Sequence, residues 1–288
     1  MYRSQTSGSE YGKIGSATSS NYSDTGLLAS TQYYYVVKAG NAAGDSDYSN
    51  QASATTDAAP TNPWRFPRPV PIGVSTGHPT ITAGTISCRV RSGETVYALS
   101  NNHVYAASNA AHIGDAVIQP GTYDGGTSPA DDIGTLSAFK EIRWSPYPLP
   151  LYPNTIDAAI ALTDVGRLGN STPSGGYGVP KTAIVVPEGN MRVQKYGRAT
   201  RLTKGTIQGV NAAIWVSYGE TGPYAYFTGQ IMIGPSGFSS GGDSGSLIVT
   251  DDENCNPVGL LFAGSSTTTF ANLIGPVLSN FGVSIDGR

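Results

Sequence analysis

Short stretches in which apolar and polar residues alternate dominate the chain, and helical periodicity is almost absent. The clearest example runs from Thr31 to Ala39, where every second residue, including Tyr33, Tyr35 and Val37, falls on one face. Gly, Pro, Asn and Asp bound these stretches, which is typical of strands separated by turns. The pattern therefore predicts an all-β protein built from many short strands.

Changes in composition divide the chain into parts. Residues 58–71 are rich in proline and predict a stiff, extended linker between an N-terminal segment, 1–57, and the remainder, 72–288. A glycine-rich break follows residue 165 and separates two strand-rich halves of similar size, about 72–165 and 185–288. Two β halves of this size predict two small barrels.

The N-terminal segment has the run Tyr22-Ser-Asp-Thr-Gly-Leu27, the alternating stretch 31–39, and Gly44-x-Ser46 followed by Tyr48-Ser49. This pattern resembles the second half of a fibronectin type III domain. The resemblance implies that Tyr33 ties its hydroxyl to the backbone upstream. A whole domain of this type has about 100 residues. We therefore expect a partial β-sandwich that begins inside the domain and is poorly stable unless it packs on the rest of the chain.

Composition and charge exclude several classes of function. Charged residues make up only 13% of the chain, and the net charge of −3 argues against a protein that binds nucleic acid by neutralising phosphates. No apolar run is long enough for a transmembrane helix, and residues 1–20 lack the apolar core of a signal peptide. Few charges with many Tyr, Ser, Thr and Gly are typical of extracellular all-β chains. We expect a secreted monomer that binds neither nucleic acid nor membrane.

No metal or cofactor is expected. The two cysteines, Cys88 and Cys255, are compatible with one disulfide or with two buried thiols, and the sequence leaves both open. The histidines have no ligand-pair spacing, and no phosphate-binding loop is present. The acidic run 251–254 lacks the spacing of a calcium loop and is interpreted as a solvated hairpin turn. A basic cluster is interpreted as a solvated face: Arg192, Lys195, Arg198, Arg201 and Lys204.

A glycine-rich turn at residues 241–246 has the sequence Gly-Gly-Asp-Ser-Gly-Ser. A serine hydroxyl such as that of Ser244 is a poor nucleophile without a base to take its proton and donors to hold the oxyanion. The turn lets the N–H groups of Gly242 and Ser244 converge on one point, and the apolar run from Leu247 anchors it. Taken alone, the motif is equally compatible with an ordinary polar hairpin turn.

A histidine and a carboxylate complete a candidate site. His103 follows the alternating stretch 96–100, so it is well placed to point into a cleft. Asp157 lies in the apolar run 155–162, where a buried charge needs a partner such as an imidazole N–H. Alone, each is compatible with a structural histidine or a loop-end cap. Asp157 is preferred over other acids whose flanks are less apolar, namely Asp115, Asp124, Asp131 and Asp132. His112 is expected on a loop and His78 in a turn.

The order His103, Asp157, Ser244 resembles that of the trypsin-like (chymotrypsin-fold) serine peptidases, and it differs from the orders of α/β-hydrolases and subtilisins. Val104 after His103 places the resemblance in the bacterial branch. Over residues 72–288 it implies two antiparallel six-stranded β-barrels with the three residues at their junction. His103 would be the general base, Asp157 its orienter and Ser244 the nucleophile. Gly242 and Ser244 would supply the oxyanion hole.

The resemblance implies a secreted serine endopeptidase that hydrolyses polypeptides through an acyl-enzyme. Asp243 would be structural, with a partner that the sequence does not reveal, and Ser246 departs from the glycine common after the nucleophile. One alternative is a catalytically silent binding or adhesion protein on the same scaffold. Another is a peptidase that cuts its own linker.

The same resemblance implies where substrate binds. It assigns the primary pocket to residues before the nucleophile, with Phe238 near its floor, and to a later strand that would pair with an extended peptide. After Ile231 neither stretch holds an acidic residue other than Asp243, which disfavours Arg and Lys side chains and favours small or apolar ones. The strand residues assigned to substrate are Phe262, Ala263 and Gly264.

Overall fold

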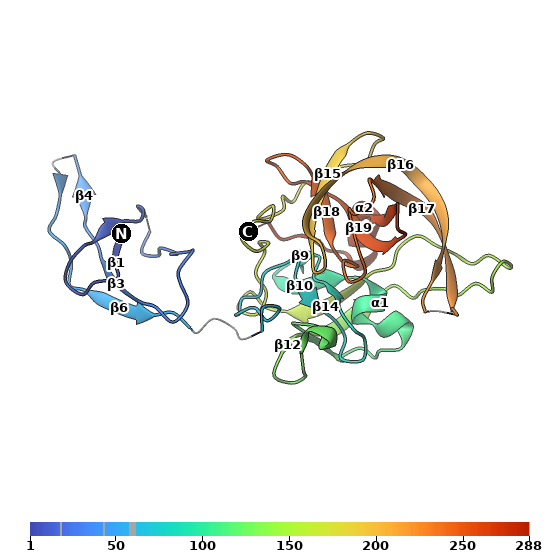
Figure 1. The fold of residues 1–288 in the computed structure, drawn as a ribbon, viewed down its shortest axis with the longest axis horizontal. Coiled ribbons are helices and arrows are strands. Elements are labelled where there is room, and N and C mark those ends of the chain that lie inside the picture. The colour runs from blue at the N-terminus through green and yellow to red at the C-terminus, as the bar shows by residue number, and fades with distance from the viewer. Residues whose placement is uncertain (18, 43, 58–61, 220, 288) are drawn as a thin grey trace. The chain divides into compact units, whose positions relative to one another are not determined.

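The chain divides into two compact units, residues 1–61 and 62–288 (Figure 1). Part of the expected linker, 58–61, lies outside the described residues, and 62–71 belong to the second unit. Within the described part, no helix is long and apolar enough to cross a membrane. The computed structural model describes residues 1–17, 19–42, 44–57, 62–219 and 221–287.

The first unit contains one antiparallel sheet in the order β2-β1-β3-β6. Tyr33 and Val36 of β3 are buried, and the Tyr33 hydroxyl oxygen accepts a hydrogen bond from the Leu28 backbone N–H at 3.0 Å. Val37, predicted on the same face as Tyr33, lies beyond the end of β3 and is exposed. The strands of this unit are β1 (Tyr2–Ser4), β2 (Gly12–Lys13), β3 (Gln32–Val36), β4 (Gly40–Asn41), β5 (Gly44–Asp45) and β6 (Ala52–Thr55).

The first barrel of the second unit is an antiparallel sheet in the order β11-β12-β14-β10-β9-β21. β21 belongs by sequence to the second half, yet it pairs with β9 of the first. A two-stranded pair, β7 (Ser75–Thr76) with β8 (Gly84–Thr85), precedes this sheet. The sheet's strands are β9 (Cys88–Ser92), β10 (Thr95–Ser100), β11 (Ala116–Ile118), β12 (Asp132–Phe139), β14 (Ala159–Thr163) and β21 (Ser284–Ile285).

The second barrel has the order β13-β17-β16-β15-β18-β19-β20, and it closes because β17 also pairs with β20. All pairs are antiparallel except that of the two-residue β13 with β17. In Figure 1, β16 and β17 form a long curved ribbon. The strands are β13 (Pro153–Asn154), β15 (Arg192–Gly197), β16 (Arg201–Ser217), β17 (Tyr224–Gly234), β18 (Leu247–Thr250), β19 (Pro257–Gly264) and β20 (Thr269–Leu273).

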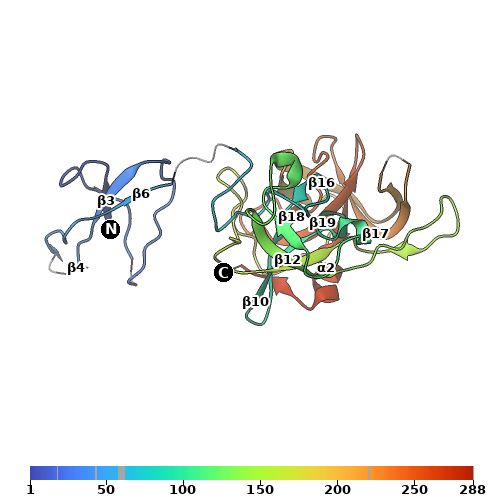
Figure 2. The ribbon, with the colours of Figure 1, turned by 90° about the horizontal axis from the view of Figure 1, so that it is seen from below.

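The helical elements are short. α1 (Asn102–Tyr105) follows β10, and two 3₁₀ turns lie at Ala107–Asn109 and Thr122–Asp124. α2 (Ile274–Phe281) buries residues at helical spacing. The residue after it, Gly282, has a left-handed backbone conformation, which glycine adopts without strain and which ends the helix. The predicted all-β class with two barrels is confirmed, and Figure 2 shows the strands from a second direction. Among the described residues the second sheet has seven strands instead of the expected six, because the two-residue β13 adds a parallel pair at its edge.

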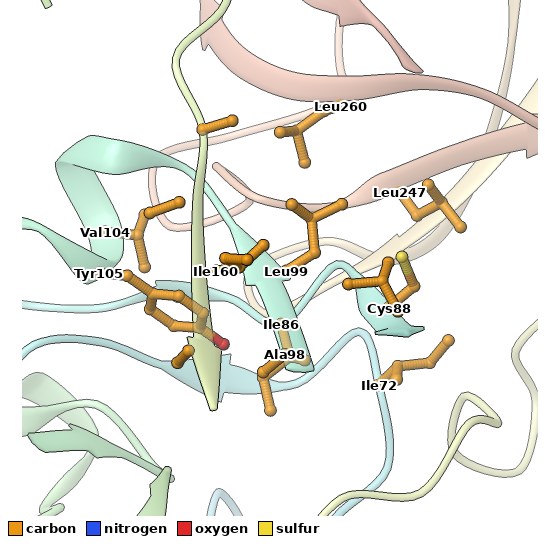
Figure 3. Packing of buried hydrophobic residues seen from close by; sticks show 14 of the residues in the cluster. Ile72, Ile86, Cys88, Ala98, Leu99, Val104, Tyr105, Ile160, Leu247 and Leu260 are labelled. Carbon is orange, nitrogen blue, oxygen red and sulfur yellow. The ribbon is translucent and has the colours of Figure 1, made fainter. Parts of the chain in front are cut away.

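One apolar cluster contains residues of both barrels (Figure 3). In β18, Leu247 and Val249 belong to this cluster, whereas Ile248 between them belongs to the second barrel's own cluster. Successive side chains of a strand point to opposite faces, so an unbroken apolar run is what a strand between two cores requires. β18 is therefore a rigid anchor for the glycine-rich turn that precedes it.

Candidate active site

The structure brings His103 and Asp157 into contact. Nδ1 of His103 lies 2.6 Å from Oδ2 of Asp157, and the His103 backbone N–H donates to Oδ1 at 3.2 Å. An ionised carboxylate only accepts hydrogen bonds, so Nδ1 carries the proton and Nε2 of the neutral ring is an acceptor. The Asp157 side chain is fully buried, whereas that of His103 is 21% exposed. The pair has the geometry of a base and its orienter.

Asp157 is held in place by groups from both barrels. Its backbone N–H donates to Asn272 of β20 at 2.9 Å, and its carbonyl accepts from the Asn101 side chain at 2.8 Å. Asn272 in turn donates to Gln230 of β17 at 2.7 Å. Buried polar groups that are hydrogen-bonded in this way rigidify a site, because leaving any of them unpaired is costly. The carboxylate is therefore fixed at the junction of the barrels.

The helix that carries His103 is anchored by its neighbours in sequence. Val104 and Tyr105 are fully buried in the shared apolar cluster (Figure 3). The backbone N–H groups of Val104 and Tyr105 donate to the carbonyl of Asn101, just before α1. Val104 and Tyr105 thus pack into the core on one side of the single turn of α1, and the preceding side chain, His103, lies at the edge of a cavity.

Ser244 lies in the turn directly before β18. Its carbonyl accepts from the Thr85 N–H at 2.7 Å, and the next N–H, of Gly245, donates to Leu261 at 2.8 Å. Gly245 has a φ of +96°, and a Cβ there would meet the Thr85 carbonyl oxygen at 2.1 Å, so only glycine fits. Ser246 is buried and donates to the Asp243 carbonyl at 2.6 Å. Ser246, which stands where glycine is common after the nucleophile, thus closes the turn through its hydroxyl.

Several backbone donors in this turn are unused. Within the described part of the chain, the N–H groups of Gly241, Gly242 and Ser244 donate no hydrogen bond to protein acceptors, although those of Asp243, Gly245 and Ser246 do. The two that flank Asp243 are those of Gly242 and Ser244. Gly242 has a φ of +95°, which is open to glycine and strained for other residues. Two free N–H groups one residue apart match the donors that an oxyanion needs.

Asp243 is paired with a residue that the sequence analysis placed elsewhere. Nζ of Lys195 lies 3.5 Å from Oδ2 of Asp243, and both side chains are fully buried. Burial lowers the pKa of Lys195, and the charge of Asp243 opposes that shift. The carboxylate also accepts from Thr200 Oγ1 at 2.6 Å and from the Ala199 N–H at 2.8 Å. The interpretation of Lys195 as part of a solvated face is wrong.

Three of the other four basic residues of that cluster pair with two carboxylates, whereas the Arg201 guanidinium lies over the Trp64 ring, 4.5 Å from its centroid. Arg198 makes two hydrogen bonds to Asp124, at 2.6 and 2.7 Å, and its side chain is only 13% exposed. Arg192 and Lys204, by contrast, are exposed and pair with Asp251, in the turn between β18 and β19. Both pairs lower the pKa of Asp251.

Two cavities meet at Ser244. One, of about 620 Å³, is lined by His103 and Ser244 together with apolar and aromatic residues that include Trp215, Tyr218 and Phe262. The other, of about 610 Å³, is lined mostly by Ser, Gly and Ala side chains from residues 237–241 and 261–266. No hydrogen bond joins His103 Nε2 to Ser244 Oγ among the described residues, although both residues line the first cavity. Contacts of this kind often tighten only when substrate is bound.

The residues assigned to substrate divide into two groups. Ala263 and Gly264 line both cavities, and Phe262 lines the first. Phe238 lines neither: it is 2% exposed, in the second barrel's apolar cluster. Its distance in sequence from Ser244 did not reveal which way the side chain points. Among the described residues, none that lines the second cavity carries a charge.

None of the other acids and histidines is hydrogen-bonded to His103 among the described residues. Asp115 contacts His78 at 3.2 Å and also accepts from the backbone of His112, whose own side chain is exposed. Asp131 pairs with Arg65 at 2.8 Å. Asp132 begins β12. The preference for Asp157 thus agrees with where the structure places these groups.

The two cysteines are both free and buried. Burial raises the pKa of the Cys88 thiol to about 12, so it is protonated at neutral pH. Of the alternatives left open by the sequence, the structure has two buried thiols. Among the described residues no group of acids, histidines and cysteines has the arrangement of a metal site.

One residue at the site was not predicted. The hydroxyl of Tyr218 donates to Oδ2 of Asp157 at 2.8 Å. Tyr218 lies 61 residues from Asp157 in a hairpin tip, and no local motif marks it. Its place at the site depends entirely on how β16 and β17 fold over the cleft.

A comparison with protein families matches residues 161–281, less than half of the chain, to a model described as the Nal1 C-terminal domain. No curated protein matches the chain. Neither comparison supports the fibronectin type III resemblance of the first unit, which stays a prediction.

Solved structures of bacterial serine proteases are similar to this chain. Thermobifida fusca Protease A is 19% identical, with a TM-score of 0.52, over 76% of this chain and 100% of its own. A Cellulomonas bogoriensis chymotrypsin is 18% identical, with a TM-score of 0.51, over 76% and 99%. A glutamic acid-specific serine protease is 17% identical, with a TM-score of 0.52, over 75% and 100%. At this identity the likeness concerns the fold, and the chain has the chymotrypsin-like two-barrel fold.

Proposed function

We propose that the second unit is a serine endopeptidase in which Ser244, His103 and Asp157 form the catalytic triad. The observation that carries the proposal is the 2.6 Å contact of His103 Nδ1 with the buried Asp157 at a cavity that Ser244 also lines. A buried carboxylate fixes one tautomer of the imidazole and stabilises the imidazolium once it forms. The ring nitrogen left free is the base that a serine hydroxyl needs.

In the proposed reaction, Ser244 Oγ attacks the peptide carbonyl while His103 Nε2 takes the hydroxyl proton. The negative charge on the carbonyl oxygen is held by the free N–H groups of Gly242 and Ser244, aimed by the glycine-rich turn. The imidazolium then gives its proton to the leaving amine, which departs and leaves an acyl-enzyme. Water, deprotonated by His103, hydrolyses the ester and restores Ser244.

The buried pair of Asp243 and Lys195 supports this assignment. The carboxylate of Asp243 accepts four hydrogen bonds from residues 199–200 and Ser240, which hold the turn in place. Preorganised donors stabilise an oxyanion because they need not reorient during the reaction. We propose that the ion pair keeps the two free N–H groups at a common point.

The second cavity is uncharged, and this predicts which substrate side chain the enzyme prefers at the residue before the cleaved bond. Its lining of small and hydroxyl-bearing side chains offers no carboxylate to a buried cation, which would be costly. For matched peptides that differ only at this residue, we expect kcat/KM with Ala to exceed that with Arg at least about tenfold. Steady-state kinetics on the two peptides measure this, and equal or reversed values would contradict the pocket assignment.

Covalent labelling tests the activity itself. A fluorophosphonate probe reacts only with a serine that is activated by its base, so the purified chain should be labelled, and peptide mapping should place the label on Ser244. An Asp157→Asn variant, which disturbs the imidazole tautomer, should react far more slowly. A folded protein that is not labelled would favour the alternative of a catalytically silent binding protein, and a label on another residue would contradict Ser244 as the nucleophile.

The remaining proposals concern context. We propose a secreted enzyme that acts on polypeptides as a monomer, without metal or cofactor, and that carries a partial fibronectin type III unit at residues 1–57. What supports the last of these is the hydrogen bond from Leu28 to the Tyr33 hydroxyl, which is typical of the corner in such sandwiches.

A further inference from the structure

Three hydrogen-bond donors surround the buried carboxylate of Asp157. The backbone and the ring of His103 supply two of them. The third is Tyr218 Oη, which donates at 2.8 Å to the same oxygen, Oδ2, that faces the imidazole. A hydroxyl bound to that oxygen has a direct influence on the hydrogen bond between Asp157 and His103.

Tyr218 is held firmly in this position. Its backbone N–H donates to Pro223 at 2.9 Å and closes the tip of the hairpin formed by β16 and β17. Its ring meets those of His103 and Trp144 edge to face, with centroids 5.8 and 5.2 Å apart. Contacts of this kind orient aromatic rings, so the hydroxyl is aimed at Asp157 by packing on its own ring.

The hydroxyl is also a permanent donor. Burial and the neighbouring charge of Asp157 raise the pKa of Tyr218 well above its ordinary value, so the proton stays on the oxygen at any pH where the enzyme would work. An ionised carboxylate has no proton to donate in return. The bond therefore runs in one direction only, from Tyr218 to Asp157.

We infer that Tyr218 is a positioning residue that fixes the orientation and basicity of His103 through Asp157. The inference rests on the proposed triad, to which it adds a fourth member supplied by the second barrel. With the Tyr218 donor in place, part of the carboxylate charge is neutralised and Oδ2 has a fixed direction. Without it, the carboxylate bears more charge against His103 and is freer to turn.

Tyr218→Phe removes this donor and keeps the ring. We expect kcat to fall about tenfold, as for loss of a hydrogen bond to a charged group, and KM to change less than about twofold, because the cavity wall is unchanged. The more exposed negative charge should stabilise the imidazolium, so the pKa on the acidic side of the pH–rate profile should rise by about half a unit or more.

Tyr226→Phe is the matched control. It removes a hydroxyl from the same hairpin, and among the described residues Tyr226 has no contact with the triad; its ring packs on Trp215 instead, 5.3 Å away. Its kcat and pH profile should match those of the wild type. If Tyr218→Phe and Tyr226→Phe have the same kcat and the same pH profile, the role of Tyr218 is refuted.

A second measurement does not need catalysis. The pKa of His103, read by NMR titration of its ring Cε1 proton and assigned through a His103 variant, should rise in Tyr218→Phe and stay constant in Tyr226→Phe. An unchanged pKa in Tyr218→Phe would overturn the inference. If the wild type is not labelled by the fluorophosphonate, the proposed function fails, and the titration alone then decides whether Tyr218 acts on this histidine.

Discussion

Ser244→Ala should lower the rate of peptide hydrolysis about 10⁶-fold and leave the fold intact. The loss is large because the hydroxyl forms the covalent intermediate, and no other group at the shared cavity replaces it. The fold should persist because the turn is held by backbone bonds of Ser244 and Gly245 and by the buried Asp243, which the substitution leaves in place. Kinetics with a peptide substrate, together with thermal unfolding, measure both effects.

Ser108→Ala is the control for this prediction. Ser108 lines the same cavity as His103 and Ser244, but the proposed mechanism gives it no role. Its activity should stay within about threefold of the wild type, because surface and rim substitutions usually have small effects. Unchanged hydrolysis in Ser244→Ala would contradict the proposed nucleophile.

Lys195→Met should lower the free energy of unfolding by about 3–5 kcal/mol and greatly reduce activity. The substitution roughly keeps the volume of the side chain but leaves the carboxylate of Asp243 buried without its cation. An uncompensated buried charge is far more costly than a lost surface pair. Denaturant unfolding measures the first effect, and labelling of Ser244 at a temperature where the variant is folded measures the second.

Lys204→Met is the control for Lys195→Met, because it shows how much stability is lost when an exposed lysine, and not a buried one, is replaced. Lys204 lies on the next strand and its side chain is 55% exposed; its partner Asp251 keeps Arg192. Loss of an exposed pair is worth at most about 1 kcal/mol. In the double variant Lys195→Met with Asp243→Asn, part of the lost stability should return. Equal destabilisation by Lys195→Met and Lys204→Met would show that the buried pair is not needed.

Alternation and turn residues were enough to predict an all-β chain with two strand-rich halves, because a strand with one buried face repeats every second residue. The two-barrel fold of the chymotrypsin type and the choice of His103, Asp157 and Ser244 needed, in addition, the resemblance in the order of their motifs. Their motifs are local, and so can be read from a few neighbouring residues. Which strands pair is a property of the whole chain, and the return of β21 to β9 has no local signal.

The residues that support the site were harder to predict. Lys195 lies two residues after Val193 on β15, so alternation would have placed it on the buried face, but its charge argued for solvent. Only the presence of Asp243, 48 positions later, makes its burial possible. Tyr218 was missed and Phe238 was misplaced for a related reason: position along the chain does not tell which side chains the fold turns toward the cavities and which it turns into a core.

The pairing of β21 with β9 has a consequence for synthesis. Residues 284–285 supply the last neighbour of a sheet that otherwise consists of residues 88–163. On the ribosome, the edge of β9 that accepts this strand stays open until residues 284–285 have emerged. His103 and Asp157 are translated before Ser244, so the proposed triad cannot assemble until the strands of the second barrel that surround Ser244 have been made.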